Sequence, residues 1–164
     1  MSTRLYLADP TDVGNLLSSL IGRSVTVKRL ATCAAPRGAF VVGAYAHDDD
    51  TRAGIAWLDI PAAAGAAAGL TLMGAVVVDE CVHGGRLFAP LDENVREVLN
   101  ICARLFATPG GERVYLRDVH LPPGKLPADL TALLGRPPAT LQLDVTIAGY
   151  RAGRMGLIAG PGRA

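Results

Sequence analysis

Residues 91–106 read LDENVREVLNICARLF, and their spacing predicts one continuous helix over 92–106. Apolar residues recur three or four positions apart, the spacing of a helix that packs on a core; they are Val95, Val98, Leu99, Cys102, Leu105 and Phe106. At about 100° per residue, the polar side chains fall on the opposite side; they are Glu93, Glu97, Asn100 and Arg104. We therefore expect a helix with a buried back and an accessible polar stripe.

Glu97 and Asn100 form an acid-x-x-Asn pair on adjacent turns of this helix and project outward together. A buried helix back would fix where an acid and an amide enter solvent, which is one way to build a site on a rigid element. An ordinary solvated face gives the same pattern, since charged faces are common on surface helices. The helix alone leaves both interpretations open.

The whole chain of 164 residues predicts a single domain over 1–164, with a core at about 12–159 and a loose C-terminal tail. A net charge of +1 without a basic run argues against nucleic-acid binding. Cys33, Cys81 and Cys102 are far apart and form no C-x-x-C pair, which favours reduced thiols and a cytoplasmic protein.

Residues 61–78, PAAAGAAAGLTLMGAVVV, are apolar over a length that suits a short membrane span, and include Gly65-x-x-x-Gly69. Alanine and glycine have little transfer energy, however, and no aromatic or basic belt flanks the run. Asp59 and Pro61 also resemble a helix start after a strand. We expect a buried helix and no membrane partner.

The remaining pattern predicts an α+β fold, with a mostly antiparallel sheet and packed helices. Residues 40–46 and 54–60 predict a hairpin, and residues 140–148 alternate as a half-buried strand. Residues 76–78 fit either a helix or a short strand, and residues 83–90 are expected to form a loop. Regular strand–helix–strand alternation is not evident in this pattern.

Three other groups of polar residues are possible sites. His47 with the aspartates at 48–50 fits a metal or phosphate cluster, but a solvated hairpin turn explains it equally well. Cys81 and His83 lack a second ligand pair at zinc spacing, so no metal site is expected. Asp12-x-x-Asn15 repeats the acid-x-x-Asn pattern, yet it falls in a first helical turn, where aspartate favours the macrodipole.

The order of elements resembles the CheX/CheC family of chemotaxis phosphatases. The resemblance spans about residues 12–159 and rests on the segments LSSLIGRSVTV, VVGAYA, GIAWLDIPAAAGAAAGLTLMG, the helix with Glu97-x-x-Asn100, and TLQLDVTIAGYRAGRMGLIA. One clear motif makes the chain more similar to CheX than to the two-motif CheC.

The resemblance implies a phosphatase that acts on the aspartyl phosphate of a CheY-type response regulator. Asn100 would orient the attacking water, and Glu97 would pair with a lysine of the receiver domain. Glu93 and Arg104 would add partner contacts. The chain would need no cofactor of its own, because Mg²⁺ is expected in the partner's receiver site.

The resemblance has departures and an alternative. Arg96 stands where the family commonly has glycine, and Arg104 follows where small residues are usual, so Arg104 would either obstruct docking or contact the phosphoryl group. The alternative is a binding or regulatory module that keeps the docking helix without chemistry. A homodimer is also expected, from the pairing of CheX through its sheet and from an exposed edge strand at 140–148.

Overall fold

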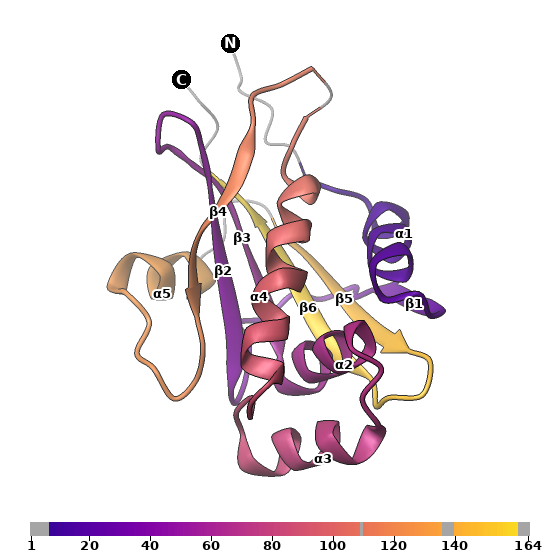
Figure 1. The fold of residues 1–164 in the computed structure, drawn as a ribbon. Helices are drawn as coiled ribbons and strands as arrows, with labels where there is room; N and C mark the ends of the chain where they lie inside the picture. Colours follow the sequence, from indigo (N-terminus) through magenta and orange to yellow (C-terminus); the bar gives the residue numbers. More distant parts are fainter. Residues whose placement is uncertain (1–6, 109, 136–139, 161–164) are drawn as a thin grey trace.

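A six-stranded antiparallel sheet forms the centre of the protein (Figure 1). The computed structural model describes residues 7–108, 110–135 and 140–160. The strand order is β1-β5-β6-β3-β2-β4, with β1 (Val25–Arg29), β2 (Phe40–His47), β3 (Arg52–Asp59), β4 (Val114–His120), β5 (Thr140–Ile147) and β6 (Gly153–Ala159). The α+β class is confirmed, whereas the predicted tail lies almost wholly outside the described residues.

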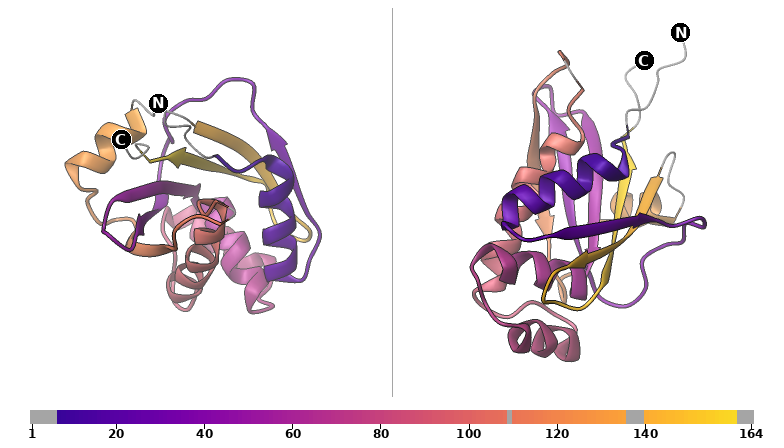
Figure 2. Two further views of the ribbon diagram at one scale, coloured as in Figure 1. Left: turned by 90° about the horizontal axis from the view of Figure 1, so that it is seen from above. Right: turned by 90° about the vertical axis from the view of Figure 1, so that its right-hand side faces the viewer.

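Helices cover both faces of the sheet but not equally (Figures 1 and 2). The larger core lies between the sheet and three helices, and a smaller core lies under one helix on the opposite face. The first face carries α1 (Pro10–Ile21), α2 (Ile60–Leu70) and α4 (Leu91–Ile101); the second carries α5 (Ala128–Gly135), while α3 (Ala75–Gly84) packs on α2. Helix α4 therefore lies on the face of the sheet that carries the larger core.

Helix α2 explains the apolar run without a membrane. Every residue from Ala62 to Gly69 is buried, because α2 contacts α1, α3, α4 and the sheet at once. Small side chains permit this approach: a Cβ on Gly69 would lie 2.5 Å from Cγ2 of Ile21. Among the described residues, none of the helices has the length and apolarity that crossing a bilayer requires.

Three sequence predictions are wrong, one at the end of α3 and two in strand β5. The predicted loop at 83–90 begins too early, because α3 runs to Gly84 and ends there with Gly85 in the left-handed conformation. Strand β5 is not an edge: it pairs with β1 on one side and β6 on the other. Gln142, placed on its polar face by alternation, is buried and bonds the backbone of Ala34.

Candidate functional site

Helix α4 has the predicted buried back and accessible polar face. Val98 and Leu99 are fully buried, whereas Glu97 and Asn100 are exposed. Within the described residues, neither of these two polar side chains makes a hydrogen bond or ion pair. The acid and the amide are therefore carried by a fixed helix and remain free to bind a partner.

Glycine in the sheet lets α4 approach closely. A Cβ built on Gly43 of β2 would lie 3.2 Å from Cδ2 of Leu99, tighter than most real contacts. Seven residues further along the chain, Phe106 packs over Gly54 and stacks on Tyr45, with ring centroids 4.6 Å apart. The two glycines thus determine how deep the end of the helix lies on the sheet.

Tyr45 ties the end of α4 to the sheet, and sequence reasoning missed it. Its hydroxyl donates a 2.6 Å hydrogen bond to the carbonyl oxygen of Leu99, the residue before Asn100. Burial, and next the nearby Cys102, raise the pKa of Tyr45 well above its ordinary value of 10, so the hydroxyl keeps its proton and stays a donor. The backbone that carries Asn100 is therefore held by a buried bond; the only signal in the sequence was an aromatic residue in an apolar strand.

The predicted helix over 92–106 changes character before its end. The α-helix stops at Ile101, and residues Cys102–Leu105 form a 3-10 turn, η1. Tighter winding shifts side chains relative to an α-helix. Arg104 is exposed and lines a cavity with residues of α1, among them Asp12 and Asn15. The sequence predicted it in the same stripe as Glu97 and Asn100, and the structure corrects this by placing it toward α1.

The other end of α4 is anchored to α2. Asn94 donates through Nδ2 to the hydroxyl of Thr71, at 3.0 Å. Glu93 is exposed in the first turn, where an acidic side chain complements the helix dipole. Hydrogen bonds thus hold both ends of the helix to neighbouring elements, and the polar face lies between these two contacts.

The second acid-x-x-Asn pair has a structural role at its acid. Asp9 caps α1, and Oδ2 of Asp12 accepts a 3.5 Å bond from the Asp9 backbone, completing a capping box. Asn15 is exposed on the same helix. The assignment of Asp12 to the helix start is therefore confirmed.

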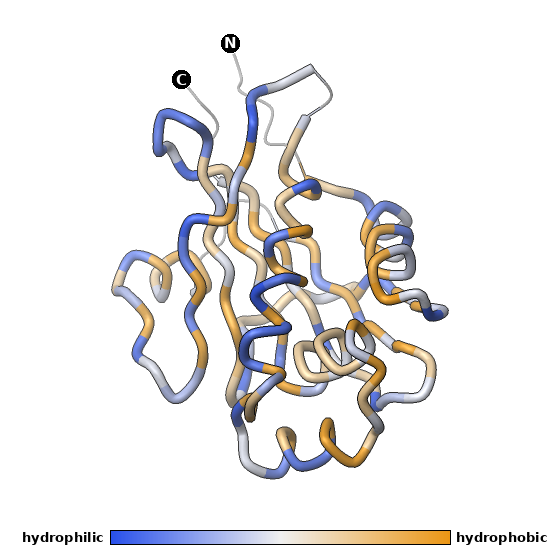
Figure 3. The backbone as a smooth tube through the Cα atoms, in the orientation of Figure 1, coloured by the Kyte–Doolittle hydropathy of each residue, from blue (hydrophilic) through white to orange (hydrophobic). Residues whose placement is uncertain are grey.

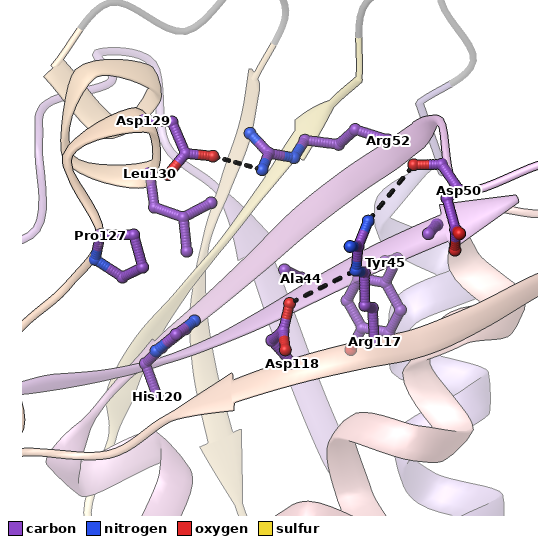
Figure 4. A pocket seen from close by; sticks show the side chains of 11 residues that line it. Ala44, Tyr45, Asp50, Arg52, Arg117, Asp118, His120, Pro127, Asp129 and Leu130 are labelled. Atoms are coloured by element: carbon purple, nitrogen blue, oxygen red, sulfur yellow. Dashed lines mark hydrogen bonds and ion pairs between the residues drawn. The ribbon is translucent and has the colours of Figure 1, made fainter.

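A separate cavity of about 370 Å³ lies on the opposite side of the sheet, beside α5 (Figure 4). Its charged side chains pair with one another: Arg52 bonds Asp129 at 2.6 Å, and Arg117 lies 3.8 Å from Asp118. Sequence spacing gave no hint of this cluster, because it joins β3, β4 and α5. The mutual pairing leaves little charge directed at a ligand.

Potential metal-ligating side chains do not cluster among the described residues. These residues contain no group of three or more His, Cys, Asp or Glu side chains that would hold an ion. After His47, Asp49 accepts from Thr51 within the turn, and Asp50 accepts from the hydroxyl of Tyr115 on β4. These contacts favour the hairpin-turn interpretation of the acidic run.

Comparison of the sequence finds no matching protein family and no matching curated protein. Comparison of the structure finds similar solved structures. The H. pylori FliM–SpeE complex contains a chain that is 8% identical, with a TM-score of 0.60, over 92% of this chain and 81% of that one. The Borrelia burgdorferi CheX-CheY-BeF3-Mg complex contains one that is 15% identical, with a TM-score of 0.54, over 94% and 99%.

FliY of Thermotoga maritima is also similar, at 13% identity and a TM-score of 0.51, over 90% of this chain and 81% of that one. At these identities the likeness concerns the fold. The chain has a CheX/CheC-like fold, which confirms the architecture that the resemblance implied.

Proposed function

We propose that this protein hydrolyses the aspartyl phosphate of a CheY-type receiver domain, with α4 as its docking helix. The observation that carries the proposal is the exposed pair Glu97 and Asn100 on a helix whose back is buried; no described residue bonds either side chain. The fold adds support, since a CheX structure of similar architecture was solved with CheY, beryllium fluoride and magnesium.

The amide of Asn100 suits the chemical step. Its Oδ1 accepts a hydrogen bond from water, and its Nδ2 donates one to a phosphoryl oxygen. A water held in line attacks phosphorus, the bond from phosphorus to the aspartate oxygen breaks, and inorganic phosphate and a free carboxylate result. The leaving group is already good, so positioning supplies most of the acceleration. Mg²⁺ would be held by the receiver.

Glu97 is the proposed anchor, three residues before Asn100 and exposed beside it. A carboxylate there can pair with a lysine of the receiver site and fix the angle at which the amide enters. Glu93 lies one turn earlier and would extend the contact. Arg104, which lies toward α1, would reach the partner only at the edge of such an interface.

The test follows the loss of label from a receiver that carries radiolabelled aspartyl phosphate. Wild-type protein should shorten the lifetime of the phosphate, and Asn100→Ala should abolish that effect with little change in stability, because an exposed amide contributes little to packing. Glu97→Lys should weaken binding more than Glu97→Ala, since it places like charges together.

Asn15→Ala is the matched control, because Asn15 is also an exposed helical amide in an acid-x-x-Asn pair. It should leave the acceleration unchanged. Loss of activity in Asn15→Ala with retention in Asn100→Ala would place the chemistry on α1 and refute the proposal.

A binding module without chemistry is the second candidate. It is favoured by the similarity to FliM chains, whose structures were solved in complexes with SpeE and, at a TM-score of 0.54, with FliG. Wild-type protein that binds a phosphorylated receiver yet leaves its phosphate lifetime unchanged would support this candidate over the phosphatase.

A further inference from the structure

Leu72 is a large apolar side chain held out in solvent beside the docking helix. It is 78% exposed, the largest fraction among the exposed large hydrophobic residues of the described chain. Its backbone has φ 59°, in the left-handed region that bulky side chains rarely adopt. Both features work against the folded state, so the position has a leucine where stability alone favours another residue.

The turn at Leu72 is a Schellman motif that ends α2. The N–H of Met73 donates to the carbonyl of Ala68 at 2.9 Å, and the N–H of Leu72 donates to that of Gly69 at 3.4 Å. The residue at the left-handed position of this motif is usually glycine. Here that position has a leucine, whose side chain packs little against the rest of the protein.

The turn is held rigid from two sides. The hydroxyl of Thr71 accepts from Asn94 of α4, one turn before Glu97. On the other side, the hydroxyl of Tyr150 donates to the carbonyl of Met73. The turn continues from the buried helix α2 (Figure 1), and the two bonds hold the backbone on either side of Leu72, one of them to α4 itself.

We infer that Leu72 is an apolar anchor for the receiver domain, inserted beside the contact made by Glu97 and Asn100. The inference rests on the proposed function and names a further part of that same docking surface. Continuity with the proposed docking helix is the argument for this occupant, because the Thr71–Asn94 bond joins the leucine turn to α4. The turn's backbone is already held in place, so binding need not order it, and the receiver would cover the leucine side chain with apolar surface.

Leu72→Gly provides the sharp test, because a structural role and an anchoring role predict opposite signs. Glycine relieves the left-handed backbone, so the melting temperature should hold or rise by about 1–4 °C. Affinity for the phosphorylated receiver should fall at least about 10-fold, as expected when a buried leucine is removed from an interface. In turnover, KM should rise while kcat stays, in contrast to Asn100→Ala.

Two further variants control the result. Leu72→Asn also suits a left-handed position but is polar, so it should weaken binding as glycine does. Leu72→Met keeps an apolar chain of similar volume and should bind within about threefold of wild type.

The outcomes separate the two proposals. If wild type, Leu72→Gly and Leu72→Asn all bind the phosphorylated receiver equally well, the anchoring role of Leu72 is refuted and the docking role of α4 is not. Wild type that binds no phosphorylated receiver would overturn both. Unchanged receiver binding together with lost self-association in Leu72→Gly would show that the leucine serves a second copy of this chain instead.

Discussion

Replacing Leu99 with alanine should remove more stability than a typical core truncation. Leu99 is fully buried, and its Cδ2 faces Gly43, which has no side chain that could move into the space. Core Leu→Ala changes cost about 2–5 kcal/mol, and the cost grows with the cavity that remains. We therefore expect the upper part of that range, about 3–5 kcal/mol, or a melting temperature lower by about 6–20 °C.

Gly43 supplies a second measurement of the same contact. A Cβ there would meet Tyr45 Oη at 3.1 Å, Leu99 Cδ2 at 3.2 Å and Leu116 Cδ1 at 3.3 Å, so Gly43→Ala should destabilise the fold by about 1–3 kcal/mol. In the Leu99→Ala background one of these three contacts is gone. The double variant should be less destabilised than the sum, by about 0.5–3 kcal/mol.

Urea denaturation of the wild type, both single variants and the double variant completes this cycle. Leu99→Met, which conserves volume, serves as the control and should cost below about 1.5 kcal/mol. A loss below about 1 kcal/mol for Leu99→Ala, or additivity within about 0.3 kcal/mol in the cycle, would refute the packing of α4 on β2.

Three further outcomes can be checked. Tyr45→Phe removes the donor to the Leu99 carbonyl, so it should cost about 1–3 kcal/mol in urea denaturation and slow the proposed dephosphorylation; unchanged values would show that the bond is dispensable. Cys33 is exposed whereas burial raises the pKa of the Cys102 thiol to about 12 and Cys81 is also buried, so a thiol reagent should label one cysteine in the native protein and three in denaturant. Burial raises the pKa of Asp59 above its ordinary 3.8, so the folded state keeps this proton to higher pH than the unfolded state does. The contribution of Asp59 to stability therefore falls as pH rises from 3.8 through the folded pKa. Asp59→Asn, which keeps the helix cap, should gain stability relative to wild type over that window, and a difference in unfolding free energy that is constant with pH would contradict this.

The elements with strong local signals could be predicted from the sequence. Helix α1 has residues typical of helix caps at its two ends, Asp9 and Gly22, and the apolar spacing on α4 identified its buried side. The acid and amide that the candidate site needs were found by the same spacing, because exposure on a helix depends mostly on periodicity.

What failed depends on partners that are distant in sequence. Alternation suggested that Gln142 faces solvent, but the segment around Ala34 covers it and satisfies its amide. The sequence predicted strand β5 as an exposed edge, but β1 pairs with it in the structure. That argument for a homodimer is therefore removed. The bond from Tyr45 to Leu99 spans 54 residues, and a local pattern does not contain such information.

The two acid-x-x-Asn pairs show why a motif needs its local structure before it supports a function. Asp12 lies at the start of α1, where its carboxylate completes the cap and so has a structural use. Glu97 lies in the body of α4, where backbone groups bond one another, and its carboxylate has no bonding partner in the part of the chain that the structure describes. The same spacing therefore gives one acid to the fold and leaves the other for a partner, and Asn100 gains its fixed position from Tyr45 rather than from the motif.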